Sequence, residues 1–133
     1  MGCGAGGFGQ RNCRDPHSMN SLPHHKLVAF EVARDLLVAV IAAKIADPKL
    51  RDQAMRAAKS ACLNVAEGAG RMSVPDRSRI FAIARGEACE AAAAVEIAAI
   101  AGDCTPESSV AANKLADRLV ALLTGLIRLR ARD

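Results

Sequence analysis

Residues 60–90 read SACLNVAEGAGRMSVPDRSRIFAIARGEACE, and their spacing predicts two helices joined by one short turn. Small and apolar residues recur at steps of three and four on both sides of that turn, as they do on a helix face packed against another helix. Before the turn these positions are Met55, Ala58, Cys62, Val65 and Ala69. After it they are Phe81, Ala84, Ala88, Ala91, Val95, Ala98 and Gly102. We therefore expect a helical hairpin.

The turn is marked by glycine, serine and proline. Gly68 and Gly70 favour the end of the first helix. Ser73 is a suitable N-cap, and Pro75 suits the first turn of the next helix. Because so short a connection forces two helices antiparallel, residues equidistant from it should face each other.

Polar residues near the turn are expected to tie the two helices together. Antiparallel pairing predicts that Glu67 lies near Arg79, Asn64 near Ala82, and Ser60 near Gly86. The predicted half-buried polar network consists of Ser60, Asn64, Glu67, Arg71, Arg85 and Glu90.

Two further helices complete the predicted fold. An apolar face over residues 26–46 includes Phe30, Leu37, Val40 and Ile41, and Asp47-Pro48 ends it. The final helix, from Pro106, carries Leu115, Leu119, Leu122, Leu126 and Leu129 at steps of four and three. With helices expected over about 48–68 and 75–101, the fold class is all-α, an up-down-up-down antiparallel four-helix bundle over residues 21–133. Residues 1–20 are Gly-rich and aperiodic, which predicts a flexible leader.

Composition supports a helical chain outside membranes. There is no Trp or Tyr and there are only three Phe, so strand-forming aromatic residues are scarce. The apolar run over residues 36–43 is far shorter than the roughly 20 residues that cross a bilayer. The five cysteines have no secretory spacing, and we interpret those on helices as packing residues. The expected localisation is cytoplasmic.

Net charge is +4, and the positive charge is concentrated in a few segments. Residues 80–105 are acidic, whereas the segments before and after them are basic. Candidate nucleic-acid-binding residues are Lys49, Arg51, Arg56, Lys59, Arg71, Arg77, Arg79, Arg128 and Arg130. Without Tyr or Trp for base stacking, binding should be directed to the backbone of RNA or DNA. Simple solvation of these side chains is the alternative.

No catalytic, metal or cofactor site is expected. A di-iron bundle needs Glu-x-x-His pairs on helices, but all three histidines precede the first predicted helix. The leader residues Cys3, Cys13 and His17, with His24 and His25, do not have the paired spacing of a zinc site. Acids beside arginines are most often salt-bridged, and the helical cysteines lack a helical histidine to activate them.

The hairpin resembles the small bacterial family of four helix bundle proteins, also known as the 23S ribosomal RNA intervening-sequence proteins. Glu87 stands where that family usually has serine. The matching residues are Gln53, Arg56, Ser60, Asn64, Val65, Ala66, Glu67, Gly68, Gly70, Arg71, Ser73, Phe81, Ile83, Ala84, Arg85, Gly86 and Glu90.

The resemblance implies a homo-oligomer, commonly a homopentamer, without enzymatic activity. Some relatives are encoded inside inserts of the large ribosomal RNA gene, and a similar group serves as the nucleic-acid-binding accessory protein of a retroelement reverse transcriptase. The expected function is therefore that of a non-enzymatic accessory protein with sequence-tolerant nucleic-acid binding. A protein-protein interaction scaffold without a nucleic-acid ligand is the alternative.

Overall fold

The computed structural model describes the backbone of residues 22–132 and the side chains of residues 22–129. The predicted leader, residues 1–20, lies outside the described residues. The described part consists of one short 3-10 helix and four α-helices: η3 (Pro23–Lys26), α1 (Val28–Ala43), α2 (Pro48–Gly70), α3 (Val74–Ile100) and α4 (Pro106–Arg132).

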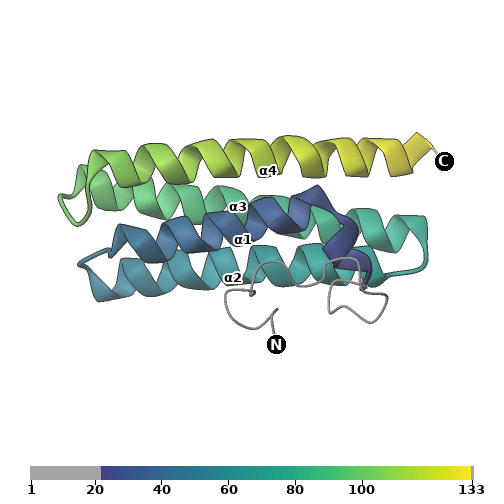
Figure 1. The fold of residues 1–133 in the computed structure, drawn as a ribbon, viewed down its shortest axis with the longest axis horizontal. Helices are drawn as coiled ribbons and strands as arrows, with labels where there is room; N and C mark the ends of the chain where they lie inside the picture. Colours follow the sequence, from purple (N-terminus) through teal and green to yellow (C-terminus); the bar gives the residue numbers. More distant parts are fainter. Residues whose placement is uncertain (1–21, 133) are drawn as a thin grey trace, which may run out of the picture.

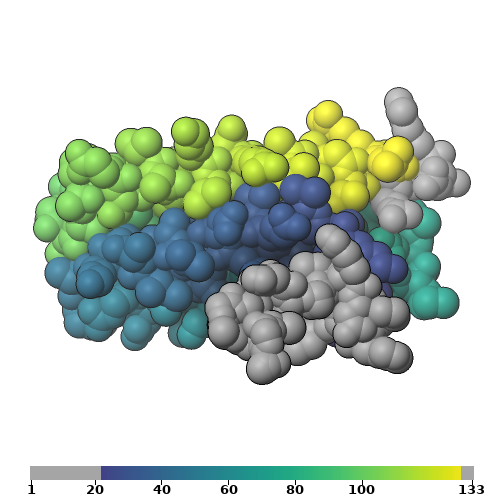
Figure 2. All heavy atoms as spheres, viewed as in Figure 1, coloured from purple at the N-terminus to yellow at the C-terminus, as the bar shows by residue number. Residues whose placement is uncertain are grey.

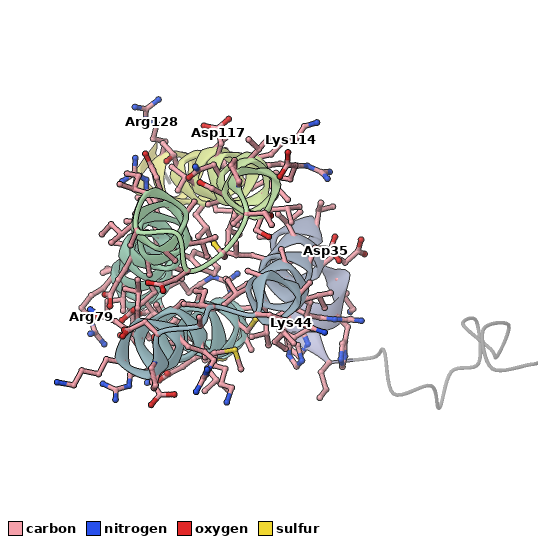
Figure 3. All side chains as sticks on the ribbon, turned by 90° about the vertical axis from the view of Figure 1, so that its left-hand side faces the viewer. Asp35, Lys44, Arg79, Lys114, Asp117 and Arg128 are labelled. Carbon is pink, nitrogen blue, oxygen red and sulfur yellow. The ribbon has the colours of Figure 1, made fainter. Side chains whose placement is uncertain are left out.

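The four α-helices form an elongated antiparallel bundle (Figure 1). Each helix packs against two neighbours, in the order α1, α2, α3, α4 and back to α1, and the view along the bundle shows one helix near each corner (Figure 3). No strand occurs in residues 22–132. The predicted up-down-up-down four-helix bundle is therefore confirmed.

The two ends of the bundle hold different elements. The hairpin end holds the α2–α3 turn, η3 and the C-terminal part of α4, and the opposite end holds the α1–α2 and α3–α4 turns (Figure 1). In the space-filling view α1 and α4 cover much of the near face, so the outer surface of α2 is seen better along the bundle (Figures 2 and 3).

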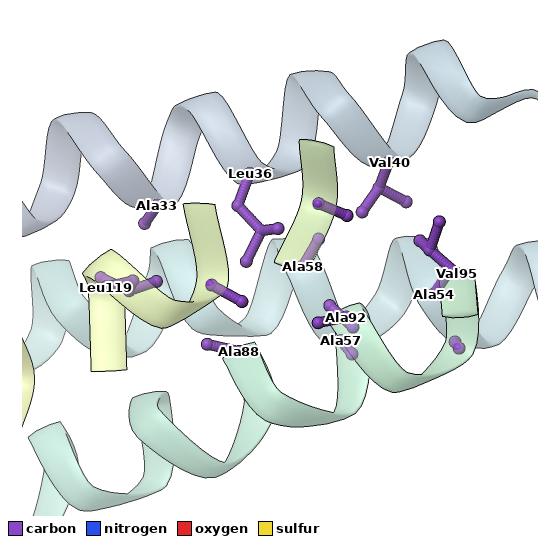
Figure 4. Packing of buried hydrophobic residues seen from close by; sticks show 14 of the residues in the cluster. Ala33, Leu36, Val40, Ala54, Ala57, Ala58, Ala88, Ala92, Val95 and Leu119 are labelled. Atoms are coloured by element: carbon purple, nitrogen blue, oxygen red, sulfur yellow. The ribbon is translucent and has the colours of Figure 1, made fainter. Parts of the chain in front are cut away.

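Alanine dominates the interior. Alanines of α2 and α3 face Leu36 and Val40 of α1 in the core (Figure 4), and the largest fully buried side chains include Phe81, Leu36 and Leu119. Because alanine side chains are short, α2 and α3 can approach closely. All predicted seam residues of the hairpin are buried or half-buried except Gly102, which lies in the turn after α3.

Helix α1 is shorter than the predicted span of residues 26–46. It begins after Leu27, whose backbone is extended, and ends where Lys44 adopts a left-handed conformation with φ 47°. Ile45 beyond that kink is 1% exposed and anchors the turn in the core. Ile41, predicted on the buried face, is instead 51% exposed, because it lies about 100° further round the helix than buried Val40.

The opposite end is closed by backbone hydrogen bonds. Gly102 has φ 83°, and its N–H donates to Ala99 O while Asp103 N–H donates to Ala98 O, 2.8 Å away. This pair of bonds is a Schellman motif, which needs the left-handed residue that glycine provides. Ala46 N–H also donates to Asp103 O over 2.9 Å, so the α1–α2 and α3–α4 turns are joined.

Candidate nucleic-acid interface

A close contact between Gly68 and Phe81 sets the spacing of the hairpin. A Cβ atom placed on Gly68 would lie 2.8 Å from two ring carbons of Phe81, which is fully buried. Only glycine gives the ring this position, because a real side chain would overlap with it. The Gly68 of the sequence motif is therefore required by packing and not by helix termination alone.

Arg77 connects the two helices of the hairpin at the same point. Its Nη1 donates to the backbone oxygens of Ala69 and Arg71, both 3.0 Å away, and its guanidinium lies 5.9 Å from the centre of the Phe81 ring. These bonds satisfy carbonyl groups at the end of α2 that have no partner within the helix. Arg77 is half-buried, so its role in the described structure is to fasten the turn.

Three ion pairs lie at the turn, and one of them, Arg71 with Asp76, connects the end of α2 to α3. Arg71 pairs with Glu67 and, over 2.8 Å, with Asp76, while Arg79 pairs with Asp76 over 3.1 Å. Hydrogen bonds from Arg79 and then Arg71 hold the pKa of Asp76 below its ordinary value. The expected neighbours Glu67 and Arg79 thus each pair with a residue nearer the turn, and Asp76, which the predicted network left out, connects two arginines.

The remaining members of the predicted polar network are not joined to these ion pairs. Asn64 Nδ2 donates to Ser60 O at 2.9 Å and to Ser60 Oγ at 3.1 Å, one turn earlier on α2. Arg85 reaches α4, where its Nε donates to Thr124 Oγ1 over 2.8 Å.

Glu90 lies in a polar groove of about 320 Å³ between α2 and α3, which is also lined by Lys49, Asp52, Gln53 and Arg56. The members of the predicted network therefore lie in four separate places and form no continuous network.

The outer surface of α2 carries cations for which no acid among the described residues forms an ion pair. We call Lys49, Arg51, Arg56 and Lys59 the α2 cationic face, which extends round the helix from Arg51 on the α1 side to Lys49 on the α3 side. All four are exposed, and no ion pair engages them within the described part of the chain. Arg51 also donates from Nη1 to Ile45 O, 3.1 Å away, which fixes its position without neutralising its charge.

The structure separates the predicted basic residues into two groups. Lys49 and Arg71 lie 22 residues apart on or next to one straight helix, which corresponds to roughly 33 Å at 1.5 Å per residue. Arg71, Arg77 and Arg79 belong to the hairpin end, where each has a partner in the fold. Arg128 is also near that end and is exposed, and it points outward in Figure 3, while the Arg130 side chain lies outside the described residues.

Cysteine occupies less buried positions than expected. Cys62 and Cys104 are half-buried, and burial raises the pKa of both thiols. Cys89 is exposed beside Ala93, so our interpretation of it as a packing residue is wrong for this side chain.

No group of three potential ligands for a metal ion occurs among the described residues, and none of the described helices is long and apolar enough to cross a membrane.

Two exposed apolar features were missed by the sequence analysis. Leu63, on the outer surface of α2, is 70% exposed and follows Lys59 by one turn. On α3, a second line of positions at steps of three and four faces outward and consists of Ile83, Gly86, Glu90, Ala93, Ile97 and Ile100. This spacing is visible in the sequence. The buried seam of α3 has the same period of three and four residues, however, and the pattern was assigned to the seam alone.

The geometry defines a class of protein: an antiparallel four-helix bundle whose hairpin is held by arginine, with a cationic face on α2 that forms no ion pair within residues 22–129. The family model described as 23S rRNA-intervening sequence protein matches residues 25–125. The chain belongs to this family, as its hairpin motif predicted. A search of the curated proteins found no match.

Proposed function

We propose that this chain is a non-enzymatic accessory protein that assembles with itself and binds RNA or DNA through the α2 cationic face. The observation that carries the proposal is that Lys49, Arg51, Arg56 and Lys59 are exposed together on one helix and are engaged by no ion pair among the described residues. Unpaired cations on one surface attract phosphates. Arg128 adds a further exposed cation at the hairpin end.

Binding of this kind is directed to the phosphate backbone. Each lysine or arginine that neutralises a phosphate releases counterions, so affinity falls steeply as salt increases. Arginines that already bond within the fold contribute less to phosphate binding. We therefore assign Arg71, Arg77 and Arg79 a role in stabilising the hairpin and not in binding the nucleic acid.

Self-association would multiply the charge of one face. The outward line on α3 contains Ile83, Ile97 and Ile100, which are 41%, 54% and 80% exposed. Exposed isoleucines on the side of α3 opposite its buried seam favour a second partner for this helix. We propose a cytoplasmic homo-oligomer that uses this line, with five subunits as the number implied by the family resemblance.

The test is binding of a labelled RNA and a labelled DNA across a salt series. The double variant Arg56→Ala, Lys59→Ala removes two charges from the α2 cationic face. The matched control, Lys114→Ala, Arg118→Ala, removes the same charge from exposed positions on α4. We expect the first variant to weaken binding by at least tenfold at low salt and to reduce the salt slope by about two, since each phosphate contact contributes roughly 0.9 to the slope.

Equal losses in the two double variants would contradict the location of the site, and no binding by the unaltered protein at low salt would contradict nucleic-acid binding. The second candidate function, a protein-protein scaffold, is favoured by the exposed isoleucines of α3. It predicts assembly or partner binding that is insensitive to both double variants.

A further inference from the structure

The α2 cationic face is not uniformly charged, because an exposed apolar side chain stands within it. Leu63 is 70% exposed and lies one turn after Lys59 and about two turns after Arg56. Residues three and four apart on a helix have Cβ atoms about 5–6 Å from each other, so the three side chains are neighbours along one surface. A ligand that reaches the two cations therefore also covers Leu63.

Beside Leu63, Ser60 and Asn64 present a fixed pair of hydrogen-bonding groups. Asn64 Nδ2 donates to the backbone oxygen of Ser60 over 2.9 Å and to its hydroxyl oxygen over 3.1 Å. This arrangement leaves Asn64 Oδ1 as an acceptor and the Ser60 hydroxyl hydrogen as a donor. Both side chains are half-buried, so contacts with the protein restrict their orientation.

We infer that the α2 cationic face binds an unpaired nucleic-acid strand, with a base lying on Leu63 and its edge hydrogen-bonded to Ser60 and Asn64. This inference rests on the proposed function and narrows its ligand. The charges of Arg56 and Lys59 attract the phosphates of the strand to α2. Leu63 can then contact the face of a base, and Ser60 and Asn64 can bond its Watson–Crick edge. In a duplex the faces of the bases are stacked and their Watson–Crick edges are occupied, so only an unpaired strand can offer both.

A duplex fits this surface less well. A duplex shows base edges in its grooves, but the faces of its bases are stacked on one another, so no base face is free to lie on Leu63. Covering an apolar side chain with charged groups gives no apolar contact in return. An aliphatic contact with a base face is tolerant of sequence, because every base has one, whereas the hydrogen bonds from Ser60 and Asn64 to the base edge add a preference at this one position.

The experiment compares a labelled oligo(A) strand with the same strand annealed to oligo(U), at one low salt concentration. Leu63→Ala keeps a good helix former on α2, and Val110→Ala is the control, because Val110 is 66% exposed on α4. We expect the unaltered protein to prefer the single strand, and Leu63→Ala to weaken binding of that strand by about fivefold while leaving duplex binding unchanged. Circular dichroism of each variant verifies folding.

A second readout separates base contact from backbone contact. In a strand that carries 2-aminopurine, fluorescence should change on binding to the unaltered protein and to Val110→Ala, and the change should be smaller with Leu63→Ala or Asn64→Ala. Equal affinity for strand and duplex, with no effect of Leu63→Ala, would overturn this inference while leaving the proposed function in place. Absence of binding to both forms would overturn the proposed function itself.

Discussion

The glycine beneath the Phe81 ring is the residue at which packing and helix propensity oppose each other. Alanine is the better helix former by about 1 kcal/mol. At Gly68, however, the added methyl group would lie 2.8 Å from the ring of a fully buried side chain. We expect Gly68→Ala to lower the free energy of unfolding by about 1–3 kcal/mol, as overpacking of a core does. Denaturant unfolding measures the change.

Gly86 provides the matched control on the opposite helix. It lies within α3, it is exposed, and an added Cβ would meet no atom within 4 Å. Gly86→Ala should therefore raise the free energy of unfolding, by up to about 1 kcal/mol. If both variants changed the free energy of unfolding in the same direction, the contact with Phe81 would not be the reason that position 68 requires glycine.

Asp76 should make the hairpin sensitive to acid. Its pKa is lowered by hydrogen bonds from Arg79 and Arg71. The charged form therefore stabilises the fold above the ordinary aspartate pKa of about 3.9, and this contribution is lost as the pH falls through the lower pKa of the folded chain. Asp76→Asn should melt at a lower temperature than the unaltered protein near neutral pH, with the difference vanishing in strong acid.

The salt dependence of this difference provides its control. The two arginine side chains are 41% and 62% exposed, so added salt should reduce the difference in melting temperature between the unaltered protein and Asp76→Asn. A difference that stays constant across pH and salt would mean that Asp76 acts through packing and not through its charge.

At the scale of the helices, the cap of α2 is a single side chain. Asp47 Oδ2 accepts a hydrogen bond from Leu50 N–H at 2.8 Å, and Pro48 occupies the first turn. Asp47→Ala should cost about 1 kcal/mol of stability because it removes this acceptor, whereas Asp47→Asn should retain most of it. Unfolding at one fixed protein concentration compares the three proteins, since self-association would otherwise contribute to stability. Equal losses in the two variants would contradict a capping role.

Helix ends marked by local chemistry were predictable, and those set by distant contacts were not. Pro48, Ser73 and Pro106 place the starts of α2, α3 and α4 within one residue of expectation. The ends of α1 were misjudged by two or three residues. The helix α1 ends because Lys44 takes a left-handed conformation, and no glycine or proline at this position indicates it in the sequence. The burial of Ile45 that accompanies this end is a tertiary contact.

The candidate site was less predictable than the fold for a related reason. The sequence shows which residues are basic, but not that Arg77 turns back onto Ala69 or that Asp76 is shared by two arginines. The basic segment therefore divides into two groups, one bonded within the fold and one without an ion pair among the described residues. Exposure of Leu63 likewise depends on which side of α2 meets its neighbours, and this follows only from the complete bundle.

At the scale of the whole molecule, the outward line on α3 predicts self-association. Ile97 is 54% exposed in that line, and Val38 on α1 is 63% exposed outside it. Placing a charge in an apolar interface costs desolvation that no partner offsets, so Ile97→Glu should lower the mass in solution at a given concentration. Val38→Glu should leave the mass unchanged. Light scattering after size exclusion measures both masses. A monomeric unaltered protein would contradict self-association, and equal oligomeric masses for all three proteins would place the assembly surface elsewhere than α3.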